Sequence, residues 1–250
     1  MKDGIIIQAR TGSSRLRNKI LLPFWGEHSI IDIIISNIKK SCPDKTIILA
    51  TTNKNSDDVL EQVAKDAGIF CFRGDEDNVL DRFIKAAEAF DLDRFIRVCS
   101  DNPFLLTDSF NILFDAHNKM GGDYVAYGFA NGCPTIKSHL GLFAELTTTK
   151  ALQKVASLTQ EKLYIEHVTI FLYSNLHLFD VNLLSLPKEL ESRHDLRFTM
   201  DTSDDFKLLQ QLYALYDKKK EKSVQTLLQL VDEFPSCKEL MRENISKNEK

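Results

Sequence analysis

The chain is poor in cysteine, lacks long apolar runs and has little net charge, and each of these absences excludes a class of protein. Its five cysteines are scattered without a CxxC pair, so neither a disulfide-stabilised secreted fold nor a zinc site is expected. No apolar stretch approaches the roughly 18 residues of a membrane-spanning helix, and no signal-peptide core follows Met1. The net charge of −4 argues against nucleic acid or a membrane as the main partner. We therefore expect a cytoplasmic protein with reduced thiols.

The first hundred residues alternate between short apolar runs, typical of strands buried on both faces, and segments with helical periodicity. The predicted strands cover residues 4–9, 45–51, 69–72 and 94–99. The predicted helices cover residues 29–40, a segment capped by Ser56 and ending near Gly68, and residues 78–90. Such βαβ units predict an α/β fold with a mainly parallel sheet covered on both faces. In these sheets ligands bind in the loops that follow the carboxyl ends of the strands.

The second half of the chain is less regular. Strands are predicted over residues 123–127, 138–143 and 196–200, and helices over 147–156, 160–165, 204–216, 224–233 and 236–245. The chain contains no internal repeat and no sharp boundary, so residues 1–250 are predicted to form one domain.

The loop after the first strand, residues 10–19, reads RTGSSRLRNK. Its three arginines and one lysine repel one another unless an anion lies among them. Gly12 permits close backbone approach, and guanidinium groups bind phosphate oxygens in pairs. The spacing is not that of a Walker A loop, and a solvated basic turn is the alternative. The position after the first strand favours a site for the phosphates of a nucleotide.

Four further motifs follow this loop along the chain. The chain contains, in this order, IIIQARTGSSRLRNKIL, FRGDEDNVLDRF, RVCSDNPFL, IEHVT and LRFTMDTSDDF, which together span about residues 4–216. This set resembles the CTP-dependent cytidylyltransferases that activate acidic sugars, the CMP-Kdo and CMP-acylneuraminate synthetases. Within that family it is most similar to the branch named for spore-coat polysaccharide biosynthesis.

The resemblance implies a three-layer nucleotidyltransferase fold of the glycosyltransferase-A type with a mixed, mainly parallel sheet. It also implies that a sugar hydroxyl attacks the α-phosphorus of CTP and that pyrophosphate leaves. Residues 1–105 would form the nucleotide-binding half, residues 106–216 the sugar-binding and dimer half, and residues 217–250 the C-terminal helices. A homodimer is expected, with residues 128–145 as a possible dimer arm.

The resemblance also assigns the residues of the site. The nucleotide-binding residues are Ala9, Arg10, Thr11, Gly12, Ser13, Arg15, Lys19, Arg73 and Asp101. Of these, Arg10, Ser13, Arg15 and Lys19 would hold the β- and γ-phosphates, and the catalytic set is Arg10, Lys19, Asp101 and Asp201. The chain departs from the family where Arg17-Asn18 replaces the usual Pro-Gly before the lysine.

Asp101 and Asp201 each follow a predicted strand, and the resemblance makes them the ligands of a Mg²⁺ ion that bridges the phosphates. Mg²⁺ is typically bound by one or two carboxylates together with substrate phosphates and water. Each aspartate has an alternative role. Asp101 could form a turn before Pro103, and Asp201 could cap the helix that begins near Asp204.

Two arginines outside the first loop allow more than one interpretation. Arg73 ends the third predicted strand and is expected to line the base or ribose pocket, with a surface ion pair to Asp75, Glu76 or Asp77 as the alternative. Arg97 is expected to be a structural arginine paired to an acid.

The sugar side is predicted from Lys137, His139 and His167. Lys137 and His139 stand where the spore-coat branch typically has acidic residues, which suggests an anionic acceptor. His167 could equally be a core histidine. The expected partners are therefore CTP and an acidic sugar, with Mg²⁺ as cofactor. A transferase for another nucleotide or sugar, and a non-catalytic nucleotide-binding protein, are the alternatives.

Overall fold

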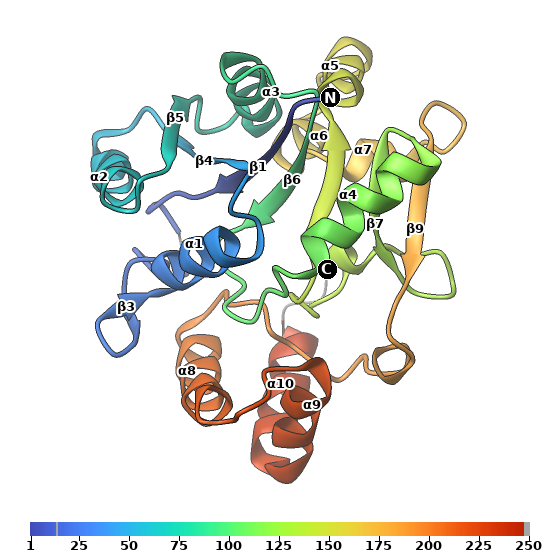
Figure 1. Cartoon of the computed structure of the whole chain (residues 1–250). Helices are drawn as coiled ribbons and strands as arrows, with labels where there is room; N and C mark the ends of the chain where they lie inside the picture. Colours follow the sequence, from blue (N-terminus) through green and yellow to red (C-terminus); the bar gives the residue numbers. More distant parts are fainter. Residues whose placement is uncertain (14, 248–250) are drawn as a thin grey trace.

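The computed structural model describes residues 1–13 and 15–247 (Figure 1). Its centre is a seven-stranded sheet with the strand order β5-β4-β1-β6-β8-β7-β9. The strands are β1 (Asp3–Gln8), β4 (Thr46–Thr52), β5 (Phe70–Gly74), β6 (Arg94–Cys99), β7 (Tyr124–Gly128), β8 (Glu145–Thr148) and β9 (Val181–Ser185). Within the described residues, β8 is antiparallel to its neighbours β6 and β7, and the other neighbouring pairs are parallel. The prediction of an α/β fold with a mixed, mainly parallel sheet is confirmed.

Helices cover both faces of the sheet, and a further group packs beside it (Figure 1). One face carries α1 (Ile30–Ser41), α2 (Asp58–Asp66) and α4 (Ser109–Met120), and the other carries α3 (Val79–Ala89), α5 (Thr149–Leu158), α6 (Lys162–Glu166) and α7 (Ile170–Ser174). The further group is α8 (Ser203–Asp217), α9 (Val224–Glu233) and α10 (Pro235–Lys247). The hairpin β2 (Pro23–Trp25) and β3 (His28–Ser29) and the short turns η1 (Asn55–Asp57), η2 (Thr135–Lys137) and η3 (Lys188–Leu190) complete the described elements.

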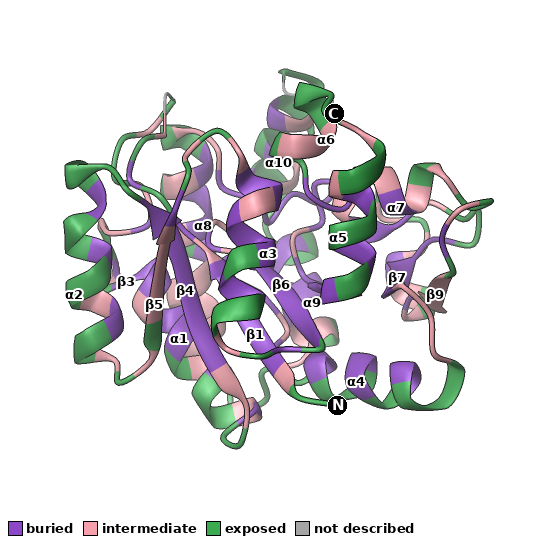
Figure 2. Ribbon diagram, turned by 90° about the horizontal axis from the view of Figure 1, so that it is seen from above, coloured by how far each residue is buried: buried purple, intermediate pink, exposed green. Residues whose placement is uncertain are grey.

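The alternation of side chains along the strands creates two hydrophobic cores. In β1, Ile5 and Ile7 pack into the core of the α1 face, whereas Ile6 packs into the core of the α3 face. The strands β1, β4 and β6 are largely buried in the middle of the molecule (Figure 2). The larger core continues into α8, α9 and α10, so these helices are attached to the sheet by apolar contacts.

Three predicted features differ from the structure. Ser56 caps no helix, because α2 begins at Asp58 and the turn η1 precedes it. Residues 138–143 form no strand, since Gly141 has φ +61° and lies against the backbone of Phe198. The next strand in the chain is β8, which begins at Glu145. Residues 196–200 form no strand and belong to neither sheet.

The segment 196–200 is held by two loops instead of by a strand. The Phe198 amide donates to the His139 carbonyl at 3.0 Å, and the Met200 amide donates to the Asp101 carbonyl at 3.0 Å.

The helices α4 and α7, the strand β9 and the β2–β3 hairpin were not predicted, because each is short or has mixed periodicity. In the part of the chain that is described, no helix is long and apolar enough to cross a membrane.

Candidate active site

The central strands end at one edge of the sheet. Gln8, the last residue of β1, is in register with Ala50 of β4 and with Cys99 of β6. The loops that follow β1, β4 and β6 therefore begin side by side, as expected for parallel strands. This edge brings the basic loop 10–19 next to residues 53–57 and 100–103.

The basic loop is shaped by Asp57, a residue that the sequence analysis did not select. The Thr11 amide donates to Asp57 Oδ1 at 2.8 Å, the Thr11 hydroxyl donates to the same oxygen at 2.5 Å, and the Thr52 hydroxyl donates to Oδ2. Asp57 is only 2% exposed. Burial by itself raises the pKa of this carboxyl, but the hydrogen bonds from Thr11 and Thr52 bring the pKa below its ordinary value. An ionised Asp57 thus ties the loop after β1 to the loop after β4.

The described part of the basic loop closes a tight turn at Asn18. The amides of Ser13 and Asn18 both donate to the Thr11 carbonyl, at 2.8 and 3.1 Å. Asn18 has φ +54°, a left-handed conformation that glycine adopts without steric cost and asparagine adopts more readily than most side chains. The Arg17-Asn18 departure therefore keeps a residue suited to the turn. Ser14 lies outside the described residues.

Lys19 lies between the two predicted metal ligands. Its Nζ is 3.1 Å from Asp101 Oδ2 and 3.8 Å from Asp201 Oδ1, and it donates to the Met200 carbonyl at 2.6 Å. Arg15 Nη2 is 3.1 Å from Asp201 Oδ1. Three segments that are far apart in sequence thus meet at one ammonium group.

Asp201 is held in place by a buried network. Arg197 Nη2 donates to Asp201 Oδ2 at 2.9 Å, and Arg197 Nε donates to Asp205 Oδ1 at 2.8 Å. Burial raises the pKa of Asp201, but the charges of Lys19, Arg15 and Arg197 outweigh this and lower it. The same kind of balance lowers the pKa of Asp205 to about 2, with Arg197 as the main stabilising partner.

The alternative role of Asp201 as a helix cap is not seen in the structure, whereas Asp101 does lie in a turn before Pro103. Thr202 caps α8, because its side chain accepts from the Asp205 amide, so the cap is not Asp201. The carboxylate of Asp101 bonds to Lys19. Both aspartates line a small cavity of about 90 Å³, next to two buried atoms, Asn102 Oδ1 and Thr199 Oγ1, that have no hydrogen-bond partner among the described residues.

These oxygen atoms fit a hard divalent cation whose coordination is completed by a bound ligand. Two carboxylates and unpaired oxygens face the same space, and oxygen donors are what Mg²⁺ and Mn²⁺ prefer. Within residues 1–13 and 15–247 no group of three or more acidic, histidine or cysteine side chains is arranged to hold a metal. A cation bound here would need phosphate oxygens or water to complete its coordination.

The remaining residues of the nucleotide prediction lie around the same edge. The Ala9 amide donates to the Ala50 carbonyl at 3.2 Å, and Gly12 is exposed. The Ser13 hydroxyl accepts from the Leu16 amide at 3.4 Å. Arg10 Nη1 is 3.8 Å from Glu76 Oε1, and its side chain is 41% exposed. Arg10, Gly12 and Ser13 are at least partly exposed, whereas Ala9 is buried, and the contact of all four with a nucleotide stays a prediction.

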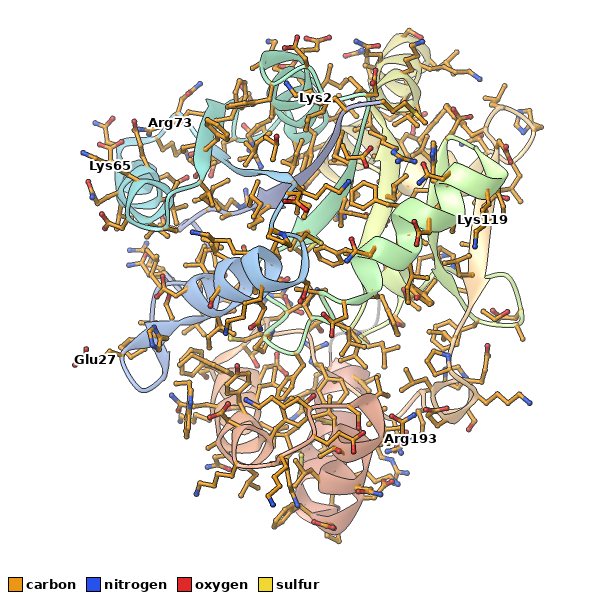
Figure 3. The ribbon with its side chains drawn as sticks, viewed as in Figure 1. Lys2, Glu27, Lys65, Arg73, Lys119 and Arg193 are labelled. Atoms are coloured by element: carbon orange, nitrogen blue, oxygen red, sulfur yellow. The ribbon has the colours of Figure 1, made fainter. Side chains whose placement is uncertain are left out.

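Arg73 is engaged by α2, at the outer edge of the sheet (Figure 3). Its Nη1 is 2.6 Å from Asp58 Oδ1 and 3.3 Å from Glu61 Oε2, and its other nitrogens donate to backbone carbonyls. The surface ion pair considered as the alternative is present, with partners other than residues 75–77. A role in the base pocket stays a prediction.

A second cavity, of about 740 Å³, opens beside Asp201. It is lined by Arg15, Arg97, Cys99, Ile136, Lys137, His167, Thr169, Ile170, Tyr173, Ser174, Asp201 and Lys247. Lys137 and His167 thus line the same cavity, and their contact with a sugar stays a prediction. His167 is exposed, so the alternative of a core histidine is wrong.

His139 is in a different place. It is buried, and its Nδ1 contacts Arg197 Nη1, behind Asp201 and not at the wall of the large cavity. The structure therefore brings His139 to the network that positions Asp201, and a contact with a sugar stays untested. Arg97 pairs with Glu145 at 2.6 Å, and burial of both side chains bears out its prediction as a structural arginine.

The fold is that of a nucleotidyltransferase. The sequence model of the cytidylyltransferase family matches residues 4–233, and the chain belongs to this family. It is 36% identical over 235 residues to an uncharacterized protein of Methanocaldococcus jannaschii, covering 94% of this chain and 92% of that one. It is 31% identical over 237 residues to the spore coat polysaccharide biosynthesis protein SpsF of Bacillus subtilis, covering 93% and 95%.

Solved structures agree with this assignment. A cytidylyltransferase from Leptospira borgpetersenii is 28% identical and superposes with a TM-score of 0.83, covering 95% of this chain and 96% of that one. CMP:2-keto-3-deoxy-manno-octonic acid synthetase, solved with CTP, has a TM-score of 0.64 at 15% identity, covering 86% and 99%. Rv0371c of Mycobacterium tuberculosis, solved with manganese, has a TM-score of 0.52 at 13% identity, covering 84% and 97%. The last two show a shared fold.

Proposed function

We propose that the enzyme uses CTP and a sugar acid of the ulosonic or nonulosonic kind to form a CMP-activated sugar acid and pyrophosphate for surface glycan synthesis. The observation that carries this proposal is the meeting of Lys19, Asp101 and Asp201 beside a cavity that Asp201 lines together with basic side chains. The family supplies the cytidylyl transfer, and the relative named for spore coat polysaccharide biosynthesis supports a glycan product.

The reaction is an in-line displacement. A hydroxyl oxygen of the acceptor forms a bond to the α-phosphorus as the bond between that phosphorus and the β-phosphate oxygen breaks. The acceptor hydroxyl loses its proton, and pyrophosphate leaves with the electron pair. Such a reaction depends on charge neutralisation and positioning. In this proposal Arg10, Ser13, Arg15 and Lys19 bind the β- and γ-phosphates, which the loop held by Asp57 brings to the end of β1.

Asp101 and Asp201 would hold Mg²⁺, which supplies positive charge to the phosphates when it is bound. Without nucleotide, Lys19 and Arg15 compensate these carboxylates. We expect both cations to turn toward the phosphates when CTP enters, since the triphosphate brings more negative charge than the two aspartates. A fold neighbour was solved with manganese, which supports a divalent metal as the cofactor.

The large cavity supports an acidic acceptor. Its volume of about 740 Å³ is within the range of small-molecule sites. Arg15, Arg97, Lys137 and Lys247 line it as cations, whereas Asp201 is the single carboxylate in the lining, and His167 adds an imidazole. Asp201, Glu145 and Glu243 already pair with Arg15, Arg97 and Lys247, and an acidic sugar adds a further anion to this basic lining, which a neutral sugar does not.

Pyrophosphate release measured with each of the four nucleoside triphosphates and with Kdo, N-acetylneuraminate and N-acetylglucosamine tests the proposal. We expect release with CTP, Mg²⁺ and a sugar acid, and none with the neutral sugar. Activity with UTP and not CTP, or with the neutral sugar only, contradicts it. Binding of CTP without release in any combination, and with the same result for the Asp101→Asn variant, would indicate a non-catalytic protein.

The homodimer, the cytoplasmic location and the division into a nucleotide half, a sugar half and C-terminal helices belong to the same proposal. Sedimentation equilibrium with the full chain tests the first of these. A mass of one chain at micromolar concentration would contradict the dimer.

A further inference from the structure

The helix α10 reaches the site from outside the segment that the family model matches. That match ends at residue 233, and α10 begins at Pro235. Asn244, near the end of the helix, is buried, and its Nδ2 donates to Asp205 Oδ1 at 3.0 Å. Asp205 binds Arg197, which in turn binds Asp201. The end of α10 is therefore fixed to the buried network that holds one of the two predicted metal ligands.

Lys247 lies three residues beyond this anchor and lines the 740 Å³ cavity. It shares that cavity with Asp201 and Arg15 from the proposed catalytic side, and with Lys137 and His167 from η2 and the end of α6. Because residues three positions apart in a helix lie on neighbouring parts of its surface, anchoring Asn244 directs Lys247 to the cavity.

The ammonium of Lys247 is available to a ligand. Its ion pair with Glu243 is 3.4 Å long, and the two side chains are 65% and 53% exposed. Exposed pairs of this kind contribute little to stability, so a substrate anion can compete for the lysine. At the catalytic end of the cavity, Asp201 is paired with Arg15, and the proposed function assigns Arg15 to the phosphates of the nucleotide. The side chains of Lys137, His167 and Lys247 offer the better place for an acceptor carboxylate.

We infer that Lys247 binds the carboxylate of the acceptor and that Asn244 positions the helix for this contact. The C-terminal helix is then a specificity element of the enzyme. This inference rests on the proposed function, because it requires an acidic acceptor.

The test compares Lys247→Ala and Lys247→Glu with Arg242→Ala. Arg242 is on the same helix, its side chain is 62% exposed, its ion pair to Asp195 is 3.9 Å long, and it does not line the cavity. Steady-state pyrophosphate release is measured with CTP and whichever of Kdo and N-acetylneuraminate the wild-type enzyme uses. Binding of both acids to the protein saturated with CDP and Mg²⁺ is measured by calorimetry.

We expect Lys247→Ala to raise KM for the sugar acid about tenfold, the effect of losing one hydrogen bond to a charged group. Lys247→Glu should raise it further, because it adds repulsion. KM for CTP should stay within about twofold of wild type in both variants, as should all parameters of Arg242→Ala. Asn244→Ala should raise KM for the sugar acid more than KM for CTP, a split that a general loss of stability does not produce.

Unchanged KM and affinity for the acid in both Lys247 variants overturn the inference while the proposed function stands. An equal effect of Arg242→Ala also overturns it, since net charge would then explain the result. If the wild-type protein binds CDP but neither acid, the acidic acceptor is wrong and the inference falls with it.

Discussion

Replacing Asp57 by alanine tests whether one buried carboxylate organises the phosphate-binding loop. The carboxylate accepts from the Thr11 amide, the Thr11 hydroxyl and the Thr52 hydroxyl, and it is 2% exposed. Leaving the Thr11 amide without a partner costs about 1–3 kcal/mol, and the lost bonds to a charged acceptor add to this. We expect a total loss of about 4 kcal/mol in the free energy of unfolding. For a domain of this size that lowers Tm by about 10 °C.

Activity should fall as well. The loop would no longer be tied to the end of β4, and a displacement of about 1 Å at reacting groups can reduce turnover about a hundredfold. Asp57→Asn keeps the shape and one acceptor oxygen, so its Tm should fall by roughly a third as much as that of the alanine variant. Differential scanning fluorimetry and pyrophosphate release with CTP measure the two effects.

The effect of Asp57 on stability should depend on pH. Its pKa in the folded protein is lower than the ordinary value of 3.8, because the hydrogen bonds from Thr11 and Thr52 outweigh the effect of burial. The stabilisation is therefore complete above pH 3.8 and is lost as the pH falls through the folded-state pKa. The difference in Tm between wild type and Asp57→Ala should shrink in strong acid.

The neighbouring residue provides the control. Asp58 is also acidic, but its side chain is 62% exposed in its pair with Arg73. Asp58→Ala should change Tm by less than about 2 °C. If Asp57→Ala kept the wild-type Tm and the wild-type KM for CTP, the loop would not depend on this carboxylate and the reasoning would be refuted.

Three further substitutions test other parts of the site. Asn18→Gly should keep pyrophosphate release near wild type. Asn18→Val should lose about 1–2 kcal/mol of stability in urea unfolding, because φ at this position is +54°. Equal stability of the two variants would contradict this prediction. Arg197→Met leaves Asp205 buried without its cation and should lower the free energy of unfolding by about 3–5 kcal/mol in the same assay. A loss below about 1 kcal/mol would argue that the Arg197–Asp205 pair does not stabilise the fold. Asp101→Asn should reduce pyrophosphate release at least about a hundredfold at saturating Mg²⁺. The Tm without ligands should change little, because the ion pair of Asp101 with Lys19 is partly exposed. Retained turnover would remove Asp101 from the proposed metal site.

Local patterns in the sequence predicted much of the sheet and its helices. The strand β6 and the helix α9 have the predicted bounds, and β1, β4 and α1 differ by one residue at each end. These elements are determined by side-chain periodicity within a window of about ten residues. This periodicity can be read from the sequence without knowledge of the fold. The same reasoning failed for residues 138–143, where Gly141 packs against Phe198, because that contact lies outside any local window.

The residues of the site divide in the same way. Lys19, Asp101 and Asp201 stand in motifs that carry the family resemblance, and their roles are predicted from that resemblance. Asp57 and Asn244 carry no such pattern. Each acts through a partner distant in the chain, Thr11 at 46 positions and Asp205 at 39 positions.

The sequence by itself thus determined most of the elements in the first hundred residues and the charged groups that are proposed to bind a nucleotide. The tertiary structure alone decided which buried carboxylate holds the basic loop, which histidine is buried behind Asp201, and that the last helix reaches the 740 Å³ cavity. The physical reason is that burial and hydrogen bonding between distant segments depend on how the layers pack, and packing is a property of the whole chain.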